Sequence, residues 1–398
     1  MTRILRNRRL TDGLVGLMLA LAALGLLVSP RTTSEAAREG LYICINVLIP
    51  SLFPFFVISM LSIELGLAQR FGRFLESLMR PLFRVGGPCA AAVALGFLGG
   101  YPVGAKCAIS LYEKGLCSKE EAERLLAFCN NSGPAFILGA AGIGILGSNS
   151  AGWLLFLTHT FASLTVGLLF RFYRSRSETE PRPCSGAGCG FRTVPPSEPG
   201  NISFSAAFTH SVKSSFVSVF YISSFVIFFT VIVRLLFTSG ALPAIAGALS
   251  RILAPLGMTA DVIQNLLTGL IELTSGLYSL QGGTAGGLAG RMAMAAFMLG
   301  WAGLSVHCQV LYFIGQSGLS PRTYLAGKIL HACISAVYAF LLARVTGLEL
   351  PAAETIAGQV ETIAHLRFFD TLTLTLTAVG ALVSIALPLS CILSKKRL

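Results

Sequence analysis

This sequence of 398 residues has few charged residues: Asp, Glu, Lys and Arg make up 12% of it, against roughly 25% in a typical soluble domain. Because 54% of the residues are hydrophobic, the composition excludes an ordinary soluble fold. The sequence also lacks the nucleophile-elbow, zinc-protease and Walker A motifs. We therefore expect neither an enzyme nor an ATP-driven pump.

Acidic residues are the scarcer charge: 18 Asp and Glu stand against 30 Lys and Arg, which gives a net charge of +12. In a soluble protein this surplus would suggest a nucleic acid partner. Here the basic residues gather in short segments between apolar runs, a bias that marks cytoplasmic loops. We therefore predict no nucleic acid partner, and cytoplasmic N- and C-termini. The basic segments are residues 3–9, 70–84, 171–182, 322–328 and 395–397.

The sequence contains long apolar runs. A membrane-spanning helix needs about 20 mostly apolar residues, so we predict a multi-pass protein of the lipid bilayer. The basic residues before the first run also fit a signal peptide, although no clean cleavage site follows. The six clear candidates for spans are residues 12–29, 41–63, 151–172, 214–238, 324–346 and 371–393.

Four further apolar stretches do not fit a simple count of crossings. Between the second and third spans the chain must cross the bilayer an odd number of times, yet that region holds two stretches, 88–112 and 125–147. The second half repeats the conflict with 260–280 and 291–314. One stretch of each pair is therefore predicted to be a broken helix or a re-entrant hairpin, which is tolerated only inside protein or along an aqueous cavity.

The two halves also match each other in residues. GFLGGYPVG at 96–104 matches GLIELTSG at 269–276, and LLAFCNNSG at 125–133 matches MAAFMLGWAG at 294–303. The first copy begins outside the membrane and the second begins inside, so the copies run in opposite senses. We predict an all-α polytopic membrane protein of two inverted repeats with re-entrant or broken helices, an architecture typical of secondary transporters.

The chain divides at a linker rich in Pro, Gly, Ser and Arg, which we expect to be a flexible cytoplasmic connection. Its two cysteines, Cys184 and Cys189, lack the second pair that a zinc site needs, and we predict no metal site and no cofactor. The predicted divisions are residues 1–39, an N-terminal transmembrane helix with its flanks; 40–172, the first repeat; 173–211, the linker; 212–346, the second, inverted repeat; and 347–398, an extracytoplasmic loop and a C-terminal transmembrane helix.

The first predicted break lies in GGYPVGAK. Gly100, Gly104 and Pro102 disfavour a continuous helix, and Tyr101 adds an amphipathic ring. A helix N-terminus exposed there would attract an anion, and Lys106 would favour an acidic substrate. The alternative is a kinked packing helix whose Lys106 reaches the membrane interface.

The second predicted break is NNSGP. Asn130, Asn131 and Ser132 can donate and accept hydrogen bonds, and each amide left unsatisfied in hydrocarbon would cost about 2–7 kcal/mol. Gly133 and Pro134 interrupt the helix. We expect these polar groups to bind substrate. The alternative is that the amides only join neighbouring helices.

The first candidate site residue in the second half is acidic. Glu272 is an ionisable residue within an apolar stretch, which indicates a functional site by default, and Thr274 and Ser275 follow it closely. It would bind a coupling proton or cation, or accept hydrogen bonds from substrate. A structural ion pair with Lys106 is the alternative.

The counterpart of NNSGP in the second half carries three polar residues, Ser305, His307 and Gln309. His307 is a candidate proton carrier, because histidine changes its charge near neutral pH. A lone histidine more often packs between helices, which is the alternative here.

Three segments carry a resemblance to a known family: GFLGGYPVGAK, EAERLLAFCNNSGPAFILGAAGIGILG and GGLAGRMAMAAFMLGWAGLSVHCQV. Over about residues 40–345 the chain resembles the sporulation integral membrane proteins of the YlbJ or SpoVV family. The resemblance implies a nucleoside-recognition Gate domain and a build similar to concentrative nucleoside transporters. It also implies movement of dipicolinic acid from the mother cell across the outer forespore membrane. The long linker is a departure that leaves the substrate open.

We therefore expect a secondary transporter of a small anionic solute, dipicolinic acid by resemblance, that works by alternating access. The four breaks should converge on one cavity near the membrane midplane. A cation-coupled nucleoside or nucleobase transporter is the first alternative, and a non-transporting membrane protein of spore assembly is the second. A coupling proton or cation and a homo-oligomer are left open as partners.

Overall fold

The structure is a computed structural model, and it describes residues 22–65, 79–174, 204–281 and 287–346 together with positions 13, 16, 17 and 20. Regular structure in these residues is entirely helical. The first half contains α2 (Pro30–Ile43), η1 (Cys44–Leu48), α3 (Ile49–Glu64), α5 (Cys89–Gly99), α6 (Val103–Glu113), α7 (Lys119–Phe128), η2 (Ala135–Ile145) and α8 (Asn149–Phe170). The second half contains α9 (Phe204–Thr238), α10 (Ala241–Leu253), η3 (Ala254–Leu256), α11 (Ala260–Ile271), α12 (Leu273–Tyr278), α13 (Gly287–Trp301), α14 (Gly303–Ser317) and α15 (Pro321–Thr346).

Several helices are long and apolar enough to cross a membrane, which confirms an all-α integral membrane protein. Four such segments lie in the described residues: Asn149–Phe170, Phe204–Thr238, Gly287–Ser317 and Pro321–Thr346. The predicted span 214–238 is part of a longer helix that begins at Phe204. Residues 12, 14, 15, 18, 19 and 21 of the predicted span 12–29, linker residues 175–203 and the whole of 347–398, including the span 371–393, lie outside the described residues.

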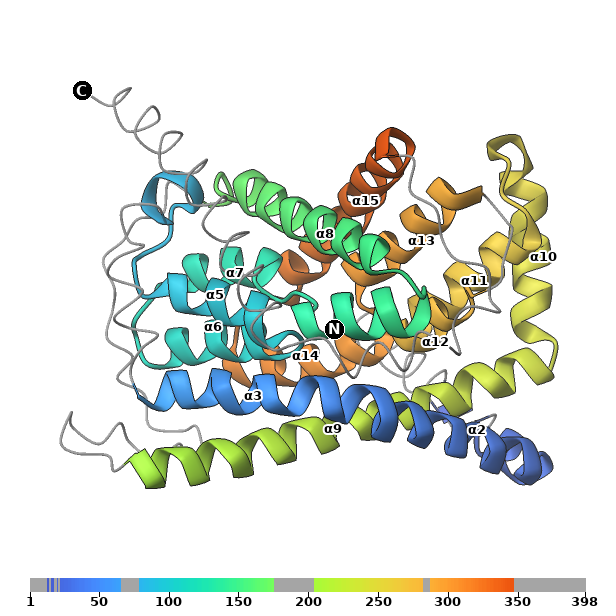
Figure 1. The fold of residues 1–398 in the computed structure, drawn as a ribbon, viewed down its shortest axis with the longest axis horizontal. Helices are drawn as coiled ribbons and strands as arrows, with labels where there is room; N and C mark the ends of the chain where they lie inside the picture. Colours follow the sequence, from blue (N-terminus) through green and yellow to red (C-terminus); the bar gives the residue numbers. More distant parts are fainter. Residues whose placement is uncertain are drawn as a thin grey trace, which may run out of the picture.

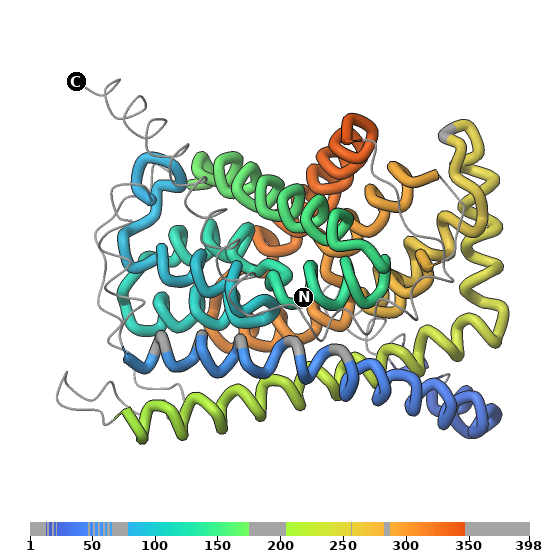
Figure 2. The backbone as a smooth tube through the Cα atoms, viewed as in Figure 1, coloured from blue at the N-terminus to red at the C-terminus, as the bar shows by residue number. Residues whose placement is uncertain are grey.

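Two long helical segments lie side by side along one edge of the molecule (Figures 1 and 2). One is the continuous run α2–η1–α3, and the other is α9. Glu39 pairs with Arg234, and Glu64 lies 3.2 Å from His210. Residue numbers therefore rise along one segment as they fall along the other, so the two segments are antiparallel. Both carry mostly apolar residues, as helices exposed to lipid do.

The stretch 88–112 is a helical hairpin. Helices α5 and α6 pack against each other and are joined by residues 100–102. Gly100, with φ +73°, makes the reversal without the steric cost that a side chain would add. At Gly104 a Cβ atom would lie 2.8 Å from the Cα of Gly96 and 2.0 Å from the carbonyl oxygen of Cys129. The hairpin therefore depends on glycine at the point where its arms meet.

The stretch 260–280 is a second helical hairpin, formed by α11 and α12 around the extended residue Glu272. Its arms also meet at glycines, because a Cβ atom on Gly276 would lie 2.2 Å from the Cα of Gly269. The two segments that match in sequence, 96–104 and 269–276, thus form the same local structure. In each pair of apolar stretches, the first is the hairpin.

The second stretch of each pair is a broken helix. Helix α7 and η2 are separated by residues 129–134, and α13 and α14 by Ala302, which has φ +81°. Each break packs on the tip of the hairpin in its own half: Gly133 lies against Gly100, and Gly303 lies against the backbone of Leu273. The halves therefore share one unit, a hairpin whose tip touches a broken helix.

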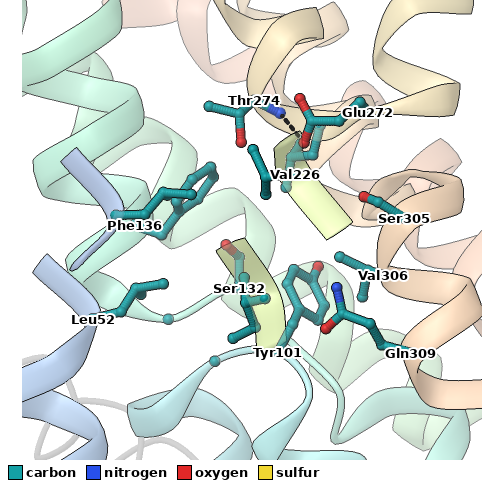
Figure 3. Close-up of a pocket in the computed structure, with 15 residues that line it drawn as sticks. Leu52, Tyr101, Ser132, Phe136, Val226, Glu272, Thr274, Ser305, Val306 and Gln309 are labelled. Carbon is teal, nitrogen blue, oxygen red and sulfur yellow. Dashed lines mark hydrogen bonds between the residues drawn. The ribbon is translucent and has the colours of Figure 1, made fainter. Parts of the chain in front are cut away.

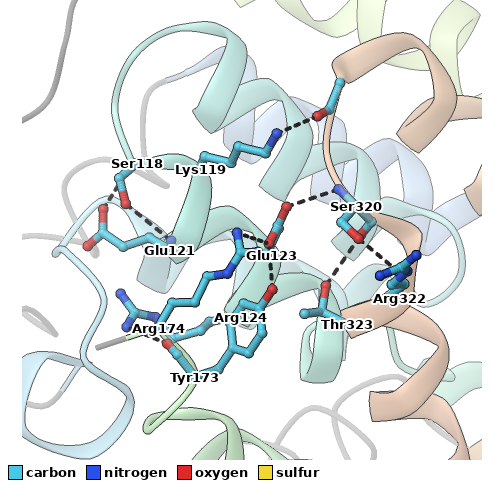
Figure 4. A network of polar contacts seen from close by, with 11 residues as sticks. Ser118, Lys119, Glu121, Glu123, Arg124, Tyr173, Arg174, Ser320, Arg322 and Thr323 are labelled. Atoms are coloured by element: carbon cyan, nitrogen blue, oxygen red, sulfur yellow. Dashed lines mark hydrogen bonds and ion pairs between the residues drawn. The ribbon is translucent and has the colours of Figure 1, made fainter. Parts of the chain in front are cut away.

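The halves are also joined directly. Helices α8 and α15 pack together, and the hydroxyl groups of Thr165 and Tyr338 are 3.0 Å apart. At the start of α7, the buried Glu123 accepts hydrogen bonds from the Ser320 N–H before α15 and from the Tyr173 hydroxyl after α8 (Figure 4). Burial, together with the Glu123 carboxylate, raises the pKa of Tyr173, which stays protonated and able to donate.

Candidate functional site

One internal cavity touches all four interruptions of the helices. Figure 3 shows the polar tips of Tyr101, Ser132 and Gln309 on one side of it, and Glu272 with Thr274 on the opposite side. Its apolar wall comes from η1, α3, η2 and α9. The predicted site residues that line it are Gly100, Tyr101, Ser132, Gly133, Glu272, Thr274, Ser305 and Gln309.

The cavity has a volume of about 50 Å³ in this conformation. A buried water molecule needs roughly 10–15 Å³ of such space, so the cavity accommodates a few waters and is too small for an aromatic dicarboxylate. A solute of that size would therefore require the hairpins or broken helices to move apart.

Two polar side-chain atoms at the cavity have no hydrogen-bond partner within the described protein. They are the hydroxyl oxygen of Ser132 and the amide oxygen of Gln309, on residues that are 2% and 1% exposed. Buried polar groups without a partner are rare, because each loses its hydrogen bonds to water. Both atoms are therefore available to a polar solute or to water in the cavity.

Tyr101 links the first hairpin to the second half of the chain. Its hydroxyl group donates to the carbonyl oxygen of Leu299, at 2.7 Å, and accepts from the ammonium group of Lys328, at 3.2 Å. The Lys328 ammonium group also donates to the carbonyl oxygen of Asn130, at 3.2 Å. A cation is thus held between the hairpin tip and the NNSGP break.

The predicted location of Lys328 was wrong. Its position in the basic segment 322–328 indicated a cytoplasmic loop. The residue lies within α15 and is fully buried. Among the described residues it forms no ion pair with a carboxylate. A buried charge without a counter-ion is costly, so such residues in membrane proteins mark binding sites or ion pathways. The prediction failed because Tyr101 and Asn130 offer oxygen acceptors to the Lys328 ammonium group inside the protein.

The NNSGP break is held from two sides. The side chain of Asn131 donates to the carbonyl oxygen of Phe128, at 2.9 Å, and the Ser132 N–H donates to Nε2 of His159, at 3.1 Å. Ser163 of α8 also donates to the Phe128 carbonyl, at 2.7 Å. These bonds satisfy backbone groups freed where α7 ends. Asn131 thus stabilises the break instead of lining the cavity.

Glu272 caps the second arm of its own hairpin. Its two carboxylate oxygens accept from the N–H groups of Thr274, at 3.1 Å, and Ser275, at 2.6 Å. Negative charge at a helix N-terminus is favourable, and the cap replaces hydrogen bonds that water would supply. The expected alternative, an ion pair with Lys106, is not what holds Glu272. Substrate binding by Glu272 stays a prediction.

Lys106 lies away from the cavity. Its ammonium group sits 4.8 Å from the ring centroid of Phe313 on α14, a cation–π contact. Pro102 and Gly104 also lie behind the cavity wall, in the hairpin turn and at the crossing of its arms. The structure therefore brings another cation, Lys328, toward the position that the sequence assigned to Lys106.

His307 packs within an aromatic cluster. Its Nδ1 lies 2.9 Å from the Tyr324 hydroxyl, and its ring is 4.2 Å from that of Trp301 at a steep angle. The cluster fixes the start of α14, next to Ser305 and Gln309, which line the cavity. A role for His307 in proton transfer stays a prediction.

Three buried residues near the site were missed by the sequence reasoning: Lys328, His159 and His331. All three lie in apolar helices, where an ionisable residue is a signal in itself. Among the described residues, no group of three or more His, Cys, Asp or Glu side chains is placed to hold a metal ion.

Comparison with known proteins identifies the family of the chain. Residues 45–149, which run from η1 to the start of α8, match the family described as Gate, nucleoside recognition. The chain is 32% identical over 332 residues to the sporulation integral membrane protein YlbJ of Bacillus subtilis (strain 168), a match that covers 79% of this chain and 78% of that protein. The chain belongs to the YlbJ family. No solved structure matches it.

Membership of the YlbJ family extends over both halves of the fold, whereas the Gate match covers the first hairpin and the first broken helix. In this YlbJ-family chain the second half supplies Glu272, Gln309 and Lys328 to the same site. The site is therefore complete only when both halves are present.

Proposed function

We propose that the protein is a secondary transporter of a small anionic solute. The observation that carries the proposal is the single cavity at which two hairpin tips and two helix breaks meet, with Ser132 and Gln309 presenting unpartnered oxygen atoms to it. Interrupted helices around an internal cavity are typical of secondary transporters. Alternating access would open the cavity to each side of the membrane in turn.

Lys328 supports an anion as the solute. Its ammonium group is buried, is one hydrogen bond from Tyr101 at the cavity wall, and lacks a carboxylate partner among the described residues. A carboxylate of the solute would supply the missing negative charge. A relative is the sporulation integral membrane protein YlbJ, and the resemblance to its family implies dipicolinic acid as the solute and the outer forespore membrane as the location. Dipicolinic acid is therefore the first solute to test.

We also propose that the two hairpin units form an inverted repeat. The antiparallel arrangement of α2–η1–α3 and α9 supports this, because these are the first long segments of the two halves. The matching crossing glycines of the two hairpins support it too. In an inverted repeat the two halves can exchange their conformations. This exchange would open the cavity first to one side of the membrane and then to the other.

The test is transport by purified protein in liposomes. Labelled dipicolinate should enter in a protein-dependent manner and be competed by unlabelled dipicolinate. The double variant Ser132→Ala, Gln309→Leu should lower the rate by about tenfold or more, since two hydrogen bonds of roughly 1 kcal/mol each would be lost. Ser224→Ala, at an exposed position of α9, is the matched control.

A second candidate is a cation-coupled nucleoside or nucleobase transporter. Glu272 at the cavity favours it, because a carboxylate accepts hydrogen bonds from ribose or base and attracts a cation, and the family match is described as nucleoside recognition. Sodium-dependent uptake of uridine without uptake of dipicolinate would establish it. Absence of transport of both would favour a non-transporting membrane protein of spore assembly.

A further inference from the structure

Two histidines meet where α8 and α15 cross. The rings of His159 and His331 have their centroids 4.3 Å apart, and each residue is 1% exposed. The residues are 172 positions apart in the chain, close to the spacing between the two hairpin motifs. Neither residue lines the cavity, yet His159 bonds to the backbone of Ser132, which does.

The hydrogen bonds fix the tautomer of each neutral ring. Nε2 of His159 accepts from the Ser132 N–H, so the proton of that ring is on Nδ1. Nε2 of His331 lies 2.9 Å from the carbonyl oxygen of His159, which only accepts, so this nitrogen carries the proton. Nδ1 of His331 therefore carries no proton and has a free lone pair.

That lone pair can take a proton without breaking any of these bonds. Nδ1 of His331 is buried and has no hydrogen-bond partner within the described protein. Protonation of His159 at Nε2 would instead remove the acceptor of the Ser132 N–H. Of the two rings, His331 is therefore the one that can change its charge while the NNSGP break stays in place.

Burial of the His331 ring opposes its protonation, and the positive charges around it add to this opposition. Lys328 lies one turn before His331 on α15, and its positive charge opposes a second one nearby. Further titratable groups lie beyond Lys328: Tyr324 and His307, which contact each other, and the Cys129 thiol, which donates to the Gly104 carbonyl oxygen. Arg291 of α13 is farther from the pair. Gly300 of α13 packs on α15 beside His331, and Arg291 precedes Gly300 by nine residues, or about 13 Å along the helix. Thus Lys328 is the nearest charge.

We infer that His331 binds a proton when an anion occupies the cavity, so that the anion and a proton are bound together. The inference rests on the proposed function. An anion near Lys328 would offset the positive charge that, in addition to burial, opposes protonation of His331. By linkage, the proton then raises the affinity for the anion by the same factor, for which about 5- to 150-fold is typical.

The experiment counts protons taken up on binding. Full-length protein in lipid nanodiscs is titrated with dipicolinate by calorimetry at about pH 7.5, where both carboxylates are ionised, in phosphate and in Tris buffer. The two buffers differ in ionisation enthalpy, so the difference in heat gives the protons bound per anion. We expect net uptake by the wild-type protein, and an affinity that rises about fivefold or more from about pH 8 to about pH 6.

His331→Gln should abolish both effects. The amide nitrogen of Gln can still donate to the His159 carbonyl oxygen, while the protonatable nitrogen is lost. His210→Gln is the matched control, since that histidine is on the outer helix α9 and pairs with Glu64. It should leave proton uptake unchanged. Equal midpoints of thermal unfolding would show that the His331 variant is folded.

The outcomes separate the two proposals. Binding of dipicolinate without proton uptake, or with uptake that persists in folded His331→Gln, overturns the inference and leaves the proposed function standing. Absence of dipicolinate binding by the wild-type protein contradicts the proposed function, and the inference with it.

Discussion

At the scale of the residue, the candidate site combines polar groups at the cavity wall with Lys328, which lies behind Tyr101. Lys328 has hydrogen bonds to Tyr101 and Asn130 but no counter-ion among the described residues, and Gln309 has a buried oxygen without a donor. Groups of this kind reduce stability, because burial removes their interactions with water. The proposed anionic solute would supply partners to these groups when it binds at the cavity.

This proposal predicts opposite effects of Lys328→Met on stability and on binding. The substitution removes a buried unpaired charge, so the midpoint of thermal unfolding should stay the same or rise. The affinity for dipicolinate should fall about 10- to 100-fold, the value expected for losing a hydrogen bond to a charged group. Scanning fluorimetry and binding calorimetry measure the two effects.

Lys106→Met is the comparison for that experiment. Lys106 contacts the Phe313 ring away from the cavity, so its loss should change the affinity much less. A larger loss of affinity in Lys106→Met than in Lys328→Met would contradict the assignment of the cation to Lys328.

At the scale of the element, the two hairpins depend on close approach of their arms. The positions of Gly96, Gly104, Gly269 and Gly276 leave no space for a side chain, although what a side chain would meet differs between them. At Gly104 the obstacle is backbone, which cannot move without displacing the Cys129 carbonyl. At Gly269 it is the side chain of Met298, which is flexible.

The difference gives a graded prediction for alanine substitutions. Gly104→Ala should lower the free energy of unfolding by more than about 3 kcal/mol, because the new Cβ would lie 2.0 Å from a backbone oxygen. Gly269→Ala should cost less, because Met298 can change rotamer. The measurement is the unfolding midpoint of each purified variant.

Gly139→Ala is the matched control in the π-helical segment η2, where a Cβ atom would meet nothing within 4 Å. It should be neutral or stabilise by about 0.4–1 kcal/mol, because alanine restricts the unfolded chain. Equal losses in Gly104→Ala and Gly139→Ala would show that the hairpin arms do not meet as described.

At the scale of the whole molecule, the site exists because two distant halves are joined. The joints are the antiparallel long helices, the crossing of α8 and α15, and the Glu123 network, which ties the start of α7 to segments flanking α8 and α15 (Figure 4). Because Glu123 is fully buried, each of its hydrogen bonds is protected from water. These joints set the distance between the halves and thus the size of the cavity.

Removing the network should weaken the contact between the halves. Glu123→Ala leaves the Ser320 N–H and the Tyr173 hydroxyl without their acceptor, and should lower the free energy of unfolding by about 1–3 kcal/mol. Limited proteolysis should also cut the segments around residues 173 and 320 sooner. Glu113→Ala, at an exposed position on α6, should change neither quantity. An unchanged midpoint in Glu123→Ala would refute the structural role.

The class of the fold and the places where its helices break can be predicted from the amino-acid sequence. Apolar length and scarce charge are local properties, so they predict membrane helices directly, and GGYPVG, NNSGP and the region of Glu272 interrupt helices through their own residues. The parity of crossings required one irregular segment in each pair. Parity could not say which stretch of each pair is the hairpin, because a hairpin and a broken helix have similar compositions.

Which charged residues lie at the candidate site follows from the packing of distant helices. Lys328 is close in sequence to basic residues that mark a cytoplasmic loop, and it reaches the interior because α15 packs across a break about 200 positions earlier in the chain. His159 and His331 meet for the same reason, since the crossing of α8 and α15 joins them. Such contacts depend on packing between segments far apart in the sequence, which periodicity and spacing along one chain do not encode.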